Sequence, residues 1–193
     1  MKKVAVIGAG ISGLFIANLF KRKKKYQVTI FERNSSIDLK EGYGIQLSVN
    51  SIKLLNKIQF DKLENSEKFN PHKINFYSIK NFNKICELYI SDFNTENCKY
   101  TTLKRSSLIN FLKKDLEKEI KFDHTISKIE QQDQIVKIAF ENNEVYEFDY
   151  LIISDGVFSK SKNLLSKNQI EPKFDDTLAI RGIIPSSSNI ADK

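Results

Sequence analysis

At 193 residues, with 40% hydrophobic residues, the chain is long enough for one domain with a core, or for one domain and part of a second. No apolar run approaches the ~20 residues of a membrane-spanning helix, and the N-terminal apolar segment lacks a signal-peptide cleavage site, so we expect a cytoplasmic protein without stable membrane insertion. The net charge of +7 comes from scattered lysines without a nucleic-acid motif, which argues against a nucleic-acid partner.

Hydrophobic periodicity predicts an alternating α/β beginning and a mainly extended middle. Up to residue 90, the predicted elements are a strand at 3–7, a helix at 12–20, a strand at 27–31, a loop at 34–43, a helix at 49–58 and a hairpin of strands 73–79 and 84–90. Beyond it, Ser106 or Ser107 caps a helix, strands follow at 124–130, 135–141 and 144–148, and a last buried strand begins at Tyr150 and ends in Asp155-Gly156. The last strand is predicted to pass through an Asp-Gly pair directly into a helix.

Three glycines follow the first strand with the spacing G-x-G-x-x-G of a dinucleotide-binding βαβ unit. In such a unit Gly8 allows the tight turn, Gly10 lets the backbone approach a pyrophosphate, and Gly13 lets the helix pack close to the strands. The helix N-terminus, here Ile11 and Ser12, then offers unpaired N–H groups to the phosphates.

Two acidic residues follow predicted strands at the carboxyl ends, where open α/β sheets bind their ligands. Glu32 has about the spacing from the glycines at which a carboxylate accepts hydrogen bonds from ribose hydroxyls. Asp155 could accept hydrogen bonds from a ribose or from ordered water, while Gly156 permits close approach to a pyrophosphate. Taken alone, the Asp155-Gly156 pair is better explained as a tight turn capped by the carboxylate.

Together these segments resemble the FAD-dependent aromatic hydroxylases, the single-component flavoprotein monooxygenases of the p-hydroxybenzoate and salicylate hydroxylase type. The resemblance is carried by residues 8–13 with Glu32-Arg33, by G-x-G-I-x-L-x-x-N at residues 42–50, by the R-x-x-L-x-x-x-L helix entry at Arg105, and by D-x-L-I-x-x-D-G-x-x-S at residues 149–159. The four stretches span nearly all of the chain, and their combination is more specific than any one of them.

The resemblance implies a role in FAD binding for each of these positions. Gly8, Gly10, Ile11, Ser12 and Gly13 would surround the pyrophosphate, Glu32 the adenosine ribose, Arg33 the adenine end, Arg105 the phosphate and ribose region, Gln46 the isoalloxazine end, and Asp155 and Gly156 both FAD and NAD(P)H. For Arg33 and Arg105 the ordinary alternative is a surface arginine in a salt bridge. The flavin carries the chemistry in this family, so we expect no catalytic side chain and no metal, and His72 and His124 are interpreted as structural or exposed.

The resemblance also implies a Rossmann-like FAD-binding α/β domain of the glutathione-reductase type, with a βαβ start and a mixed second sheet, and the beginning of a substrate-binding β-sheet domain. We expect residues 1–71 and 101–166 to form the FAD domain, and residues 72–100 and 174–193 to form part of the substrate sheet, with a strand at 178–185. The implied reaction is the hydroxylation of a small aromatic substrate by O2, with NADH or NADPH as the electron donor.

Two departures from the family pattern are visible. Lys162 stands where the family often has arginine, so the planar fork that binds a phosphate through two bonds is lost. Family members are also much longer and carry a second FAD motif that is not found here, so the chain looks like their N-terminal half. An FAD-dependent reductase or dehydrogenase and a nucleotide-binding module without turnover stay open as alternatives. An NAD-only Rossmann dehydrogenase would need a catalytic His, Lys or Tyr constellation, which is not found.

Overall fold

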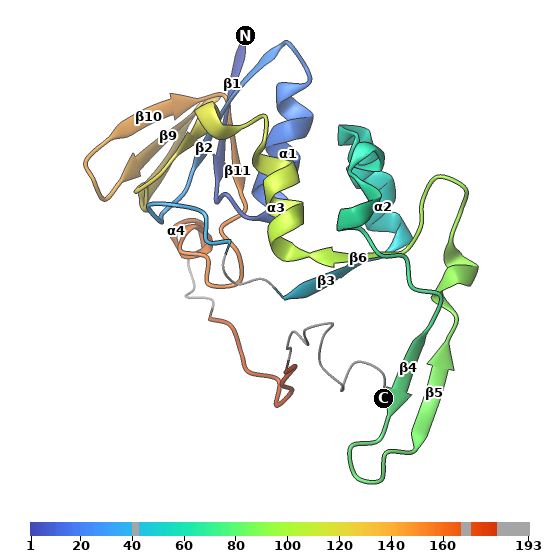
Figure 1. Ribbon diagram of the computed structural model, residues 1–193. Coiled ribbons are helices and arrows are strands. Elements are labelled where there is room, and N and C mark those ends of the chain that lie inside the picture. Colours follow the sequence, from blue (N-terminus) through green and yellow to red (C-terminus); the bar gives the residue numbers. More distant parts are fainter. Residues whose placement is uncertain (40–42, 167–170, 181–193) are drawn as a thin grey trace.

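A parallel four-stranded sheet forms the centre of the computed structural model, which describes residues 1–39, 43–166 and 171–180 (Figure 1). The strand order is β11-β1-β2-β7, with β1 at Lys2–Ile7, β2 at Tyr26–Phe31, β7 at Ile120–Lys121 and β11 at Tyr150–Ile153. β1 pairs in parallel with both β2 and β11, so strands from the two ends of the sequence lie side by side. The predicted α/β class with a Rossmann-like parallel sheet is confirmed.

Two helices, α1 (Ile11–Lys21) and α3 (Arg105–Lys113), lie together on one side of this sheet (Figure 1). The side-chain amide of Asn18 joins them, because its Nδ2 donates to the carbonyl oxygen of Leu112 at 2.7 Å. The larger core lies between the helices and the sheet and includes Val4, Val6, Leu14, Ala17, Ile30, Leu108, Ile109 and Leu112. Within the described residues, no helix is both long enough and apolar enough to cross a membrane.

An antiparallel meander covers the other face of the sheet. It consists of β8 (Ile126–Gln132), β9 (Ile135–Phe140) and β10 (Val145–Phe148). Its second core surrounds the fully buried ring of Phe31 at the end of β2, whose centroid lies 4.5 Å from that of Phe140. The carboxyl end of β2 is therefore packed on both faces of the sheet, through Ile30 and Phe31. This packing positions Glu32, the residue that follows β2.

A small two-stranded sheet links the second helix to α3. β3 (Gly44–Leu47) pairs antiparallel with β6 (Thr101–Lys104), and α2 (Val49–Leu55) follows β3 directly. The sequence pattern predicted a strand neither at β3 nor at β6. The remaining helical segments are short: η1 (Asn56–Ile58), η2 (Phe60–Lys62), η3 (Asn65–Glu67), η4 (Ile90–Phe93), η5 (Glu117–Glu119) and α4 (Ser161–Leu165).

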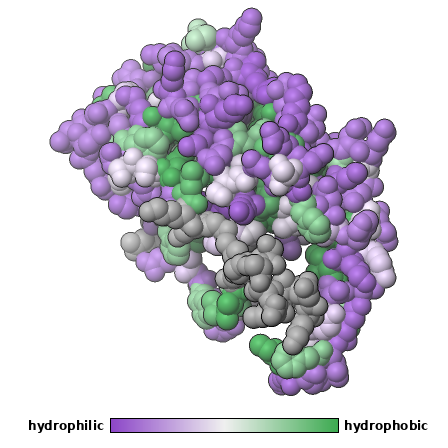
Figure 2. Space-filling model, in the orientation of Figure 1, coloured by the Kyte–Doolittle hydropathy of each residue, from purple (hydrophilic) through white to green (hydrophobic). Residues whose placement is uncertain are grey.

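The predicted hairpin is present as β4 (Ile74–Tyr77) and β5 (Lys84–Leu88) and extends away from the α/β body (Figure 1). Its pairing places the apolar side chains Ile74, Phe76, Cys86 and Leu88 on one face, because side chains two residues apart share a face. Figure 2 shows hydrophobic side chains gathered at this lower end of the molecule, where Phe76 and Leu88 are exposed.

Ion pairs fix the polar face of the hairpin. Lys73, Lys84 and Tyr89 form hydrogen bonds with the Glu87 carboxylate, and these bonds lower the pKa of Glu87 to about 2. We expect an NMR titration to show that the Glu87 carboxyl group stays ionised until the pH falls to about 2. In Lys73→Met the hydrogen bond that lowers the Glu87 pKa most is lost, so this pKa should move back toward its ordinary value. An ordinary Glu87 pKa in the wild type would contradict the geometry.

Two local predictions need correction. The helix α3 begins at Arg105 with Lys104 at its N-cap and no capping side chain, so Ser106 and Ser107 lie inside its first turn. The reason is that β6 runs straight into the helix without an intervening loop. The strand β11 does not pass directly into a helix, because a turn separates Asp155 from the start of α4 at Ser161.

The predicted strand at 178–185 has no counterpart at residues 178–180, which are neither helix nor strand, and its remainder lies outside the described residues. The same holds for residues 181–193 of the expected substrate sheet. The division of the chain into a discontinuous FAD domain and part of a substrate domain therefore stays a prediction.

Candidate functional site

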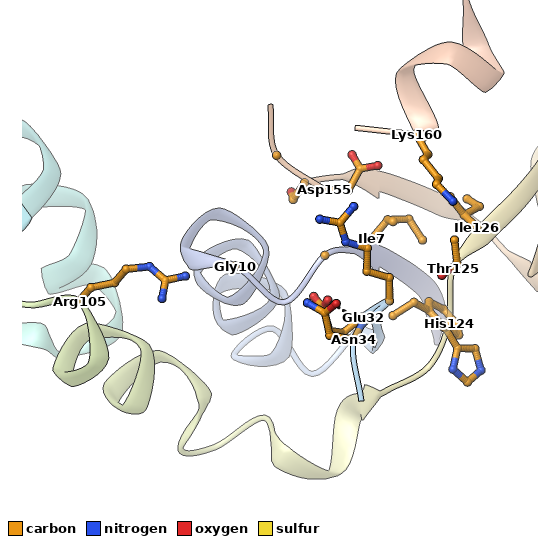
Figure 3. A pocket seen from close by; sticks show the side chains of 15 residues that line it. Ile7, Gly10, Glu32, Asn34, Arg105, His124, Thr125, Ile126, Asp155 and Lys160 are labelled. Atoms are coloured by element: carbon orange, nitrogen blue, oxygen red, sulfur yellow. Dashed lines mark hydrogen bonds between the residues drawn. The ribbon is translucent and has the colours of Figure 1, made fainter. Parts of the chain in front are cut away.

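A pocket of about 290 Å³ opens at the carboxyl ends of β1, β2 and β11 (Figure 3). This edge of an open α/β sheet is where ligands bind, because the loops there leave a crevice. Seven residues singled out from the sequence line it together: Gly8, Gly10, Glu32, Arg33, Arg105, Asp155 and Gly156. Residues more than one hundred positions apart in the chain thus meet in one site.

The glycine loop is shaped by close backbone contacts at two of its three glycines. Gly8 has φ +100°, and a Cβ there would lie 2.5 Å from the carbonyl oxygen of Ser154. A Cβ on Gly13 would lie only 1.9 Å from the carbonyl oxygen of Gly8. At Gly10, in contrast, a Cβ would meet nothing within 4 Å. Contacts within the protein therefore do not require a glycine at position 10. The space beside Gly10 is open and could hold a ligand group.

The N-terminus of α1 follows this open space. Gly10 is its N-cap, and no side chain of the described residues caps the helix there. The first N–H groups of a helix have no partner within the helix, and the dipole adds positive potential, so this end favours an anion. The side chains of Ile11 and Ser12 are not on the pocket; they line a separate apolar hollow of about 170 Å³ beside Leu108.

The Glu32 carboxylate holds the pocket loops in place. Its Oε2 accepts the N–H of Ala9 at 2.9 Å, and its Oε1 accepts the N–H of Asn34 at 3.0 Å. An ionised carboxylate has about four acceptor positions, so two remain for ligand hydroxyls. Glu32 therefore shapes the glycine loop as well as offering acceptors to a ligand, and the sequence indicated only the second of these roles.

Asp155 combines a structural contact with a buried carboxylate oxygen. Its Oδ2 accepts the N–H of Ser161 at 3.1 Å, which agrees with the turn-capping interpretation. Its Oδ1 is buried and has no hydrogen-bond partner among the described residues. Burial raises the pKa of the Asp155 carboxyl, but hydrogen bonding by Ser159 and Ser161 outweighs it, and the net pKa lies below its usual value. The group is thus an ionised acceptor whose second oxygen is buried within the protein.

This lowered pKa predicts a pH-dependent contribution of Asp155 to stability. A carboxyl whose folded pKa lies below its unfolded value stabilises the fold above the unfolded pKa, about 4 for Asp, and loses that contribution as the pH falls through the folded pKa. We expect Asp155→Asn to melt below the wild type at pH 7. The difference in Tm should shrink as the pH is lowered below about 4. Melting curves between pH 7 and pH 3 test this, and a constant difference in Tm would contradict it.

The two arginines reach the pocket from different elements. Arg105 extends from the start of α3 toward Gly10 (Figure 3), and its Nη1 donates to the carbonyl oxygen of Asp38 at 3.4 Å. Arg33 directly follows Glu32 at the end of β2 and lines the same pocket. Gln46 is exposed on β3 and is not among the pocket residues.

Sequence reasoning missed the wall formed by the connection between β7 and β8. His124, Thr125 and Ile126 line the pocket there, and Lys160 comes close to them from the turn before α4 (Figure 3). His124 is buried and its Nε2 lies 3.1 Å from an oxygen of Glu144, which agrees with a structural histidine. The wall depends on the two-residue strand β7, which is too short to leave a periodic signal.

The sequence of the chain is similar to those of known proteins. Residues 6–37 match the family model "NAD(P)-binding Rossmann-like domain". The chain is 23% identical to the 6-hydroxynicotinate 3-monooxygenase of Bordetella bronchiseptica, over 95% of this chain and 48% of that protein. It is 24% identical to the salicylate hydroxylase of Pseudomonas putida, over 95% of this chain and 43% of that protein.

The fold is similar to that of CtdE, solved in complex with FAD and a substrate, with a TM-score of 0.74 and 18% identity over 90% of this chain and 42% of that one. In each case the chain spans less than half the length of the protein that it matches. The match therefore concerns one part of a longer architecture.

Proposed function

We propose that this chain, which is similar in sequence and fold to the N-terminal part of FAD-dependent aromatic hydroxylases, binds FAD as part of such an enzyme. The observation that carries the proposal is the pocket at the end of the parallel sheet. There the open space beside Gly10, the Glu32 carboxylate and the turn of Asp155 come together. These features suit a diphosphate, a ribose and a further hydroxyl group, all of which FAD carries.

The residues fit the phosphate-containing part of FAD. Gly10 and the N–H groups of Ile11 and Ser12 would hold the diphosphate, because that end of α1 is uncapped and positively polarised. Glu32 would accept the ribose hydroxyls. Arg33 and Arg105 would balance the phosphate charge from the two sides of the pocket.

The other predicted residues follow from this placement. Gly8 and Gly13 would shape the loop around the diphosphate, since a Cβ at either position would collide with the protein's own backbone. Asp155 would accept a ligand hydroxyl with its ionised carboxylate, and Gly156 leaves room beside it. Gln46 would contact the isoalloxazine end, outside the pocket that holds the adenosine diphosphate.

FAD would supply the chemistry in the complete enzyme, namely transfer of electrons from NADH or NADPH to O2 and hydroxylation of a small aromatic substrate. The contribution of this chain is to bind and orient the cofactor. Because the pKa of Asp155 is lowered, its carboxylate accepts hydrogen bonds at neutral pH and does not donate one. We place the enzyme in the cytoplasm, where NADH and NADPH are available.

Ligand competition tests which part of FAD the pocket recognises. Fluorescence titration of the protein with FAD, followed by displacement with ADP or with FMN, separates the two halves of the cofactor. ADP should displace FAD, because the pocket residues match the adenosine diphosphate, and FMN should displace it at least about 100-fold less well, a difference of about 2.7 kcal/mol. Equal displacement by FMN would contradict this assignment.

Oxygen uptake distinguishes a hydroxylase from a reductase. The FAD-loaded protein would be mixed with NADH, with and without salicylate as the probe. Uptake that rises with salicylate supports a hydroxylase. NADH oxidation that does not depend on the aromatic acid favours the reductase alternative, and FAD that is bound but never bleached by NADH favours a binding module without turnover.

A further inference from the structure

The loop that joins β4 to β5, residues 78–83, carries two large apolar side chains at its apex. Ile79 is 88% exposed and Phe82 is 79% exposed, and both lie beyond the last residue pair of the hairpin. Ile85, at the start of β5, is also exposed. Figure 1 shows the loop at the outer end of the hairpin, away from the parallel sheet. Exposed apolar groups gathered in this way mark contact sites on soluble proteins.

The backbone at Phe82 is strained. Its φ is +56°, in the left-handed region that a bulky side chain disfavours and that asparagine tolerates better. Asn81 and Asn83 stand on either side, so residues better suited to this conformation are only one position away. Since the ring is exposed, its burial in the protein does not offset the strain. Strain of this kind concentrates at functional positions, which favours contact of the ring with another surface.

Hydrogen bonds within the loop satisfy much of its backbone. The N–H of Ser78 donates to the carbonyl oxygen of Asn83 at 2.8 Å, and the N–H of Phe82 donates to that of Ser78 at 2.8 Å. Side-chain oxygens accept two more N–H groups: Ser78 Oγ accepts that of Lys80 at 3.3 Å, and Asn81 Oδ1 accepts that of Asn83 at 3.1 Å. Unbonded N–H groups are costly to transfer into an apolar medium, so these bonds make the apex easier to bury there.

The charge of the hairpin has one sign around this apex. Residues 72–86 contain Lys73, Lys80 and Lys84 but no aspartate or glutamate. Lys73 and Lys84 pair with Glu87 nearer the base of the hairpin. Lys80 is exposed between the two apolar residues of the apex and has no ion-pair partner among the described residues. An unpaired cation in this position, on a chain with a net charge of +7, favours an anionic partner surface.

We propose that the apex of this hairpin inserts reversibly into the surface of an anionic lipid bilayer, with Ile79 and Phe82 among the acyl chains and Lys80 at the headgroups. A layer of protein that packs against the hairpin covers a face of it and leaves the apex exposed, whereas lipid surrounds an inserted loop on all sides. The bilayer therefore accounts for the apolar residues of the apex, the bonded backbone and the lysine together. The proposal does not depend on FAD binding.

Vesicle binding tests the proposal with two lipid compositions, phosphatidylcholine alone and an equal mixture of phosphatidylcholine and phosphatidylserine. In co-sedimentation, the double variant Ile79→Ser/Phe82→Ser should bind the mixed vesicles at least about 10-fold more weakly than the wild type, because two large apolar side chains no longer leave water. The matched control is Val157→Ser/Phe158→Ser, whose side chains are 69% and 74% exposed on the turn before α4. The control should bind within about 2-fold of the wild type.

A second pair of variants tests the contribution of charge. Lys80→Gln should weaken binding to the mixed vesicles by about 5-fold and leave binding to phosphatidylcholine unchanged. Lys24→Gln removes the same charge from an exposed position after α1, at the opposite end of the molecule (Figure 1). Its binding to the mixed vesicles should stay within about 2-fold of the wild type, because a charge that far from the bilayer is screened by salt.

A tryptophan placed at the apex reports insertion directly. The chain has no tryptophan, so Phe82→Trp introduces a single fluorescent indole. Its emission should be quenched by vesicles whose acyl chains carry bromine. Phe158→Trp places the indole on the α/β body at similar exposure, and its emission should not be quenched when the protein is bound to the same vesicles.

Four results would overturn the proposal. The first is absence of wild-type binding to the mixed vesicles, and the second is an equal loss of binding in the two double variants. The third is unquenched emission of Phe82→Trp in protein that sediments with brominated vesicles. The fourth is a dimer that forms without lipid and is lost in Ile79→Ser/Phe82→Ser, because the apex would then contact a second copy of the chain.

Discussion

Replacing Gly10 with valine should leave the protein folded and lower its affinity for FAD by at least about 100-fold, or about 2.7 kcal/mol. A Cβ at this position meets nothing within 4 Å, and φ is −77°, so the side chain fits without strain. It would occupy the open space where the diphosphate has to approach the backbone. The loss of the N-cap glycine should cost only about 1 kcal/mol of stability.

The matched control for this variant is Gly13→Ala. A Cβ there would lie 1.9 Å from the carbonyl oxygen of Gly8, so it should destabilise the fold by about 3 kcal/mol or more. Thermal melts and FAD titrations of both variants should thus show opposite patterns. If Gly10→Val binds FAD as tightly as the wild type, the diphosphate does not lie at this loop.

Glu32→Ala should weaken both FAD binding and the fold. The affinity should fall by about 10- to 100-fold, or about 1.4 to 2.7 kcal/mol, because two acceptors for ribose hydroxyls disappear. The N–H of Ala9, which is bonded to Glu32 at 2.9 Å, would lose its partner in a partly buried position, at a cost of about 1–3 kcal/mol. Calorimetric titration with FAD and denaturant unfolding measure the two effects separately.

Glu96→Ala provides the control for the charge change. Glu96 is exposed and is not among the pocket residues, so its removal should alter neither the FAD affinity nor the stability by more than about 0.5 kcal/mol. An FAD affinity of Glu32→Ala equal to that of this control would remove Glu32 from the binding site, whatever its effect on stability.

Three of the four strands of the parallel sheet, β1, β2 and β11, were predictable because they carry strong local signals. The apolar run of β1, the glycine spacing and the apolar strand β11 with its Asp-Gly end are each visible within a few residues of sequence. The comparisons also agree with the resemblance to FAD-dependent aromatic hydroxylases. The four-residue pairing of β3 with β6 was not predictable, because each strand is short and its partner lies more than fifty residues away.

The sequence indicated the glycine loop and the two acidic residues of the candidate site, Glu32 and Asp155. It did not indicate the pocket wall formed by the connection between β7 and β8. Glu32 and Asp155 follow the carboxyl ends of strands, where open α/β sheets bind their ligands. His124, Thr125 and Ile126 reach the pocket only because β7 pairs with the end of β2. The second role of Glu32, holding the N–H of Ala9, is a contact between distant segments that no sequence spacing reveals.

The visible absorption spectrum of the purified protein tests the central claim most directly. The protein would be incubated with FAD and then separated from free flavin by gel filtration, with Gly10→Val treated in parallel. We predict that the wild type retains flavin bands close to one FAD per chain and that the variant emerges colourless. A colourless wild-type protein, or equal retention by both proteins, would contradict the assignment of the glycine-loop pocket as the FAD site.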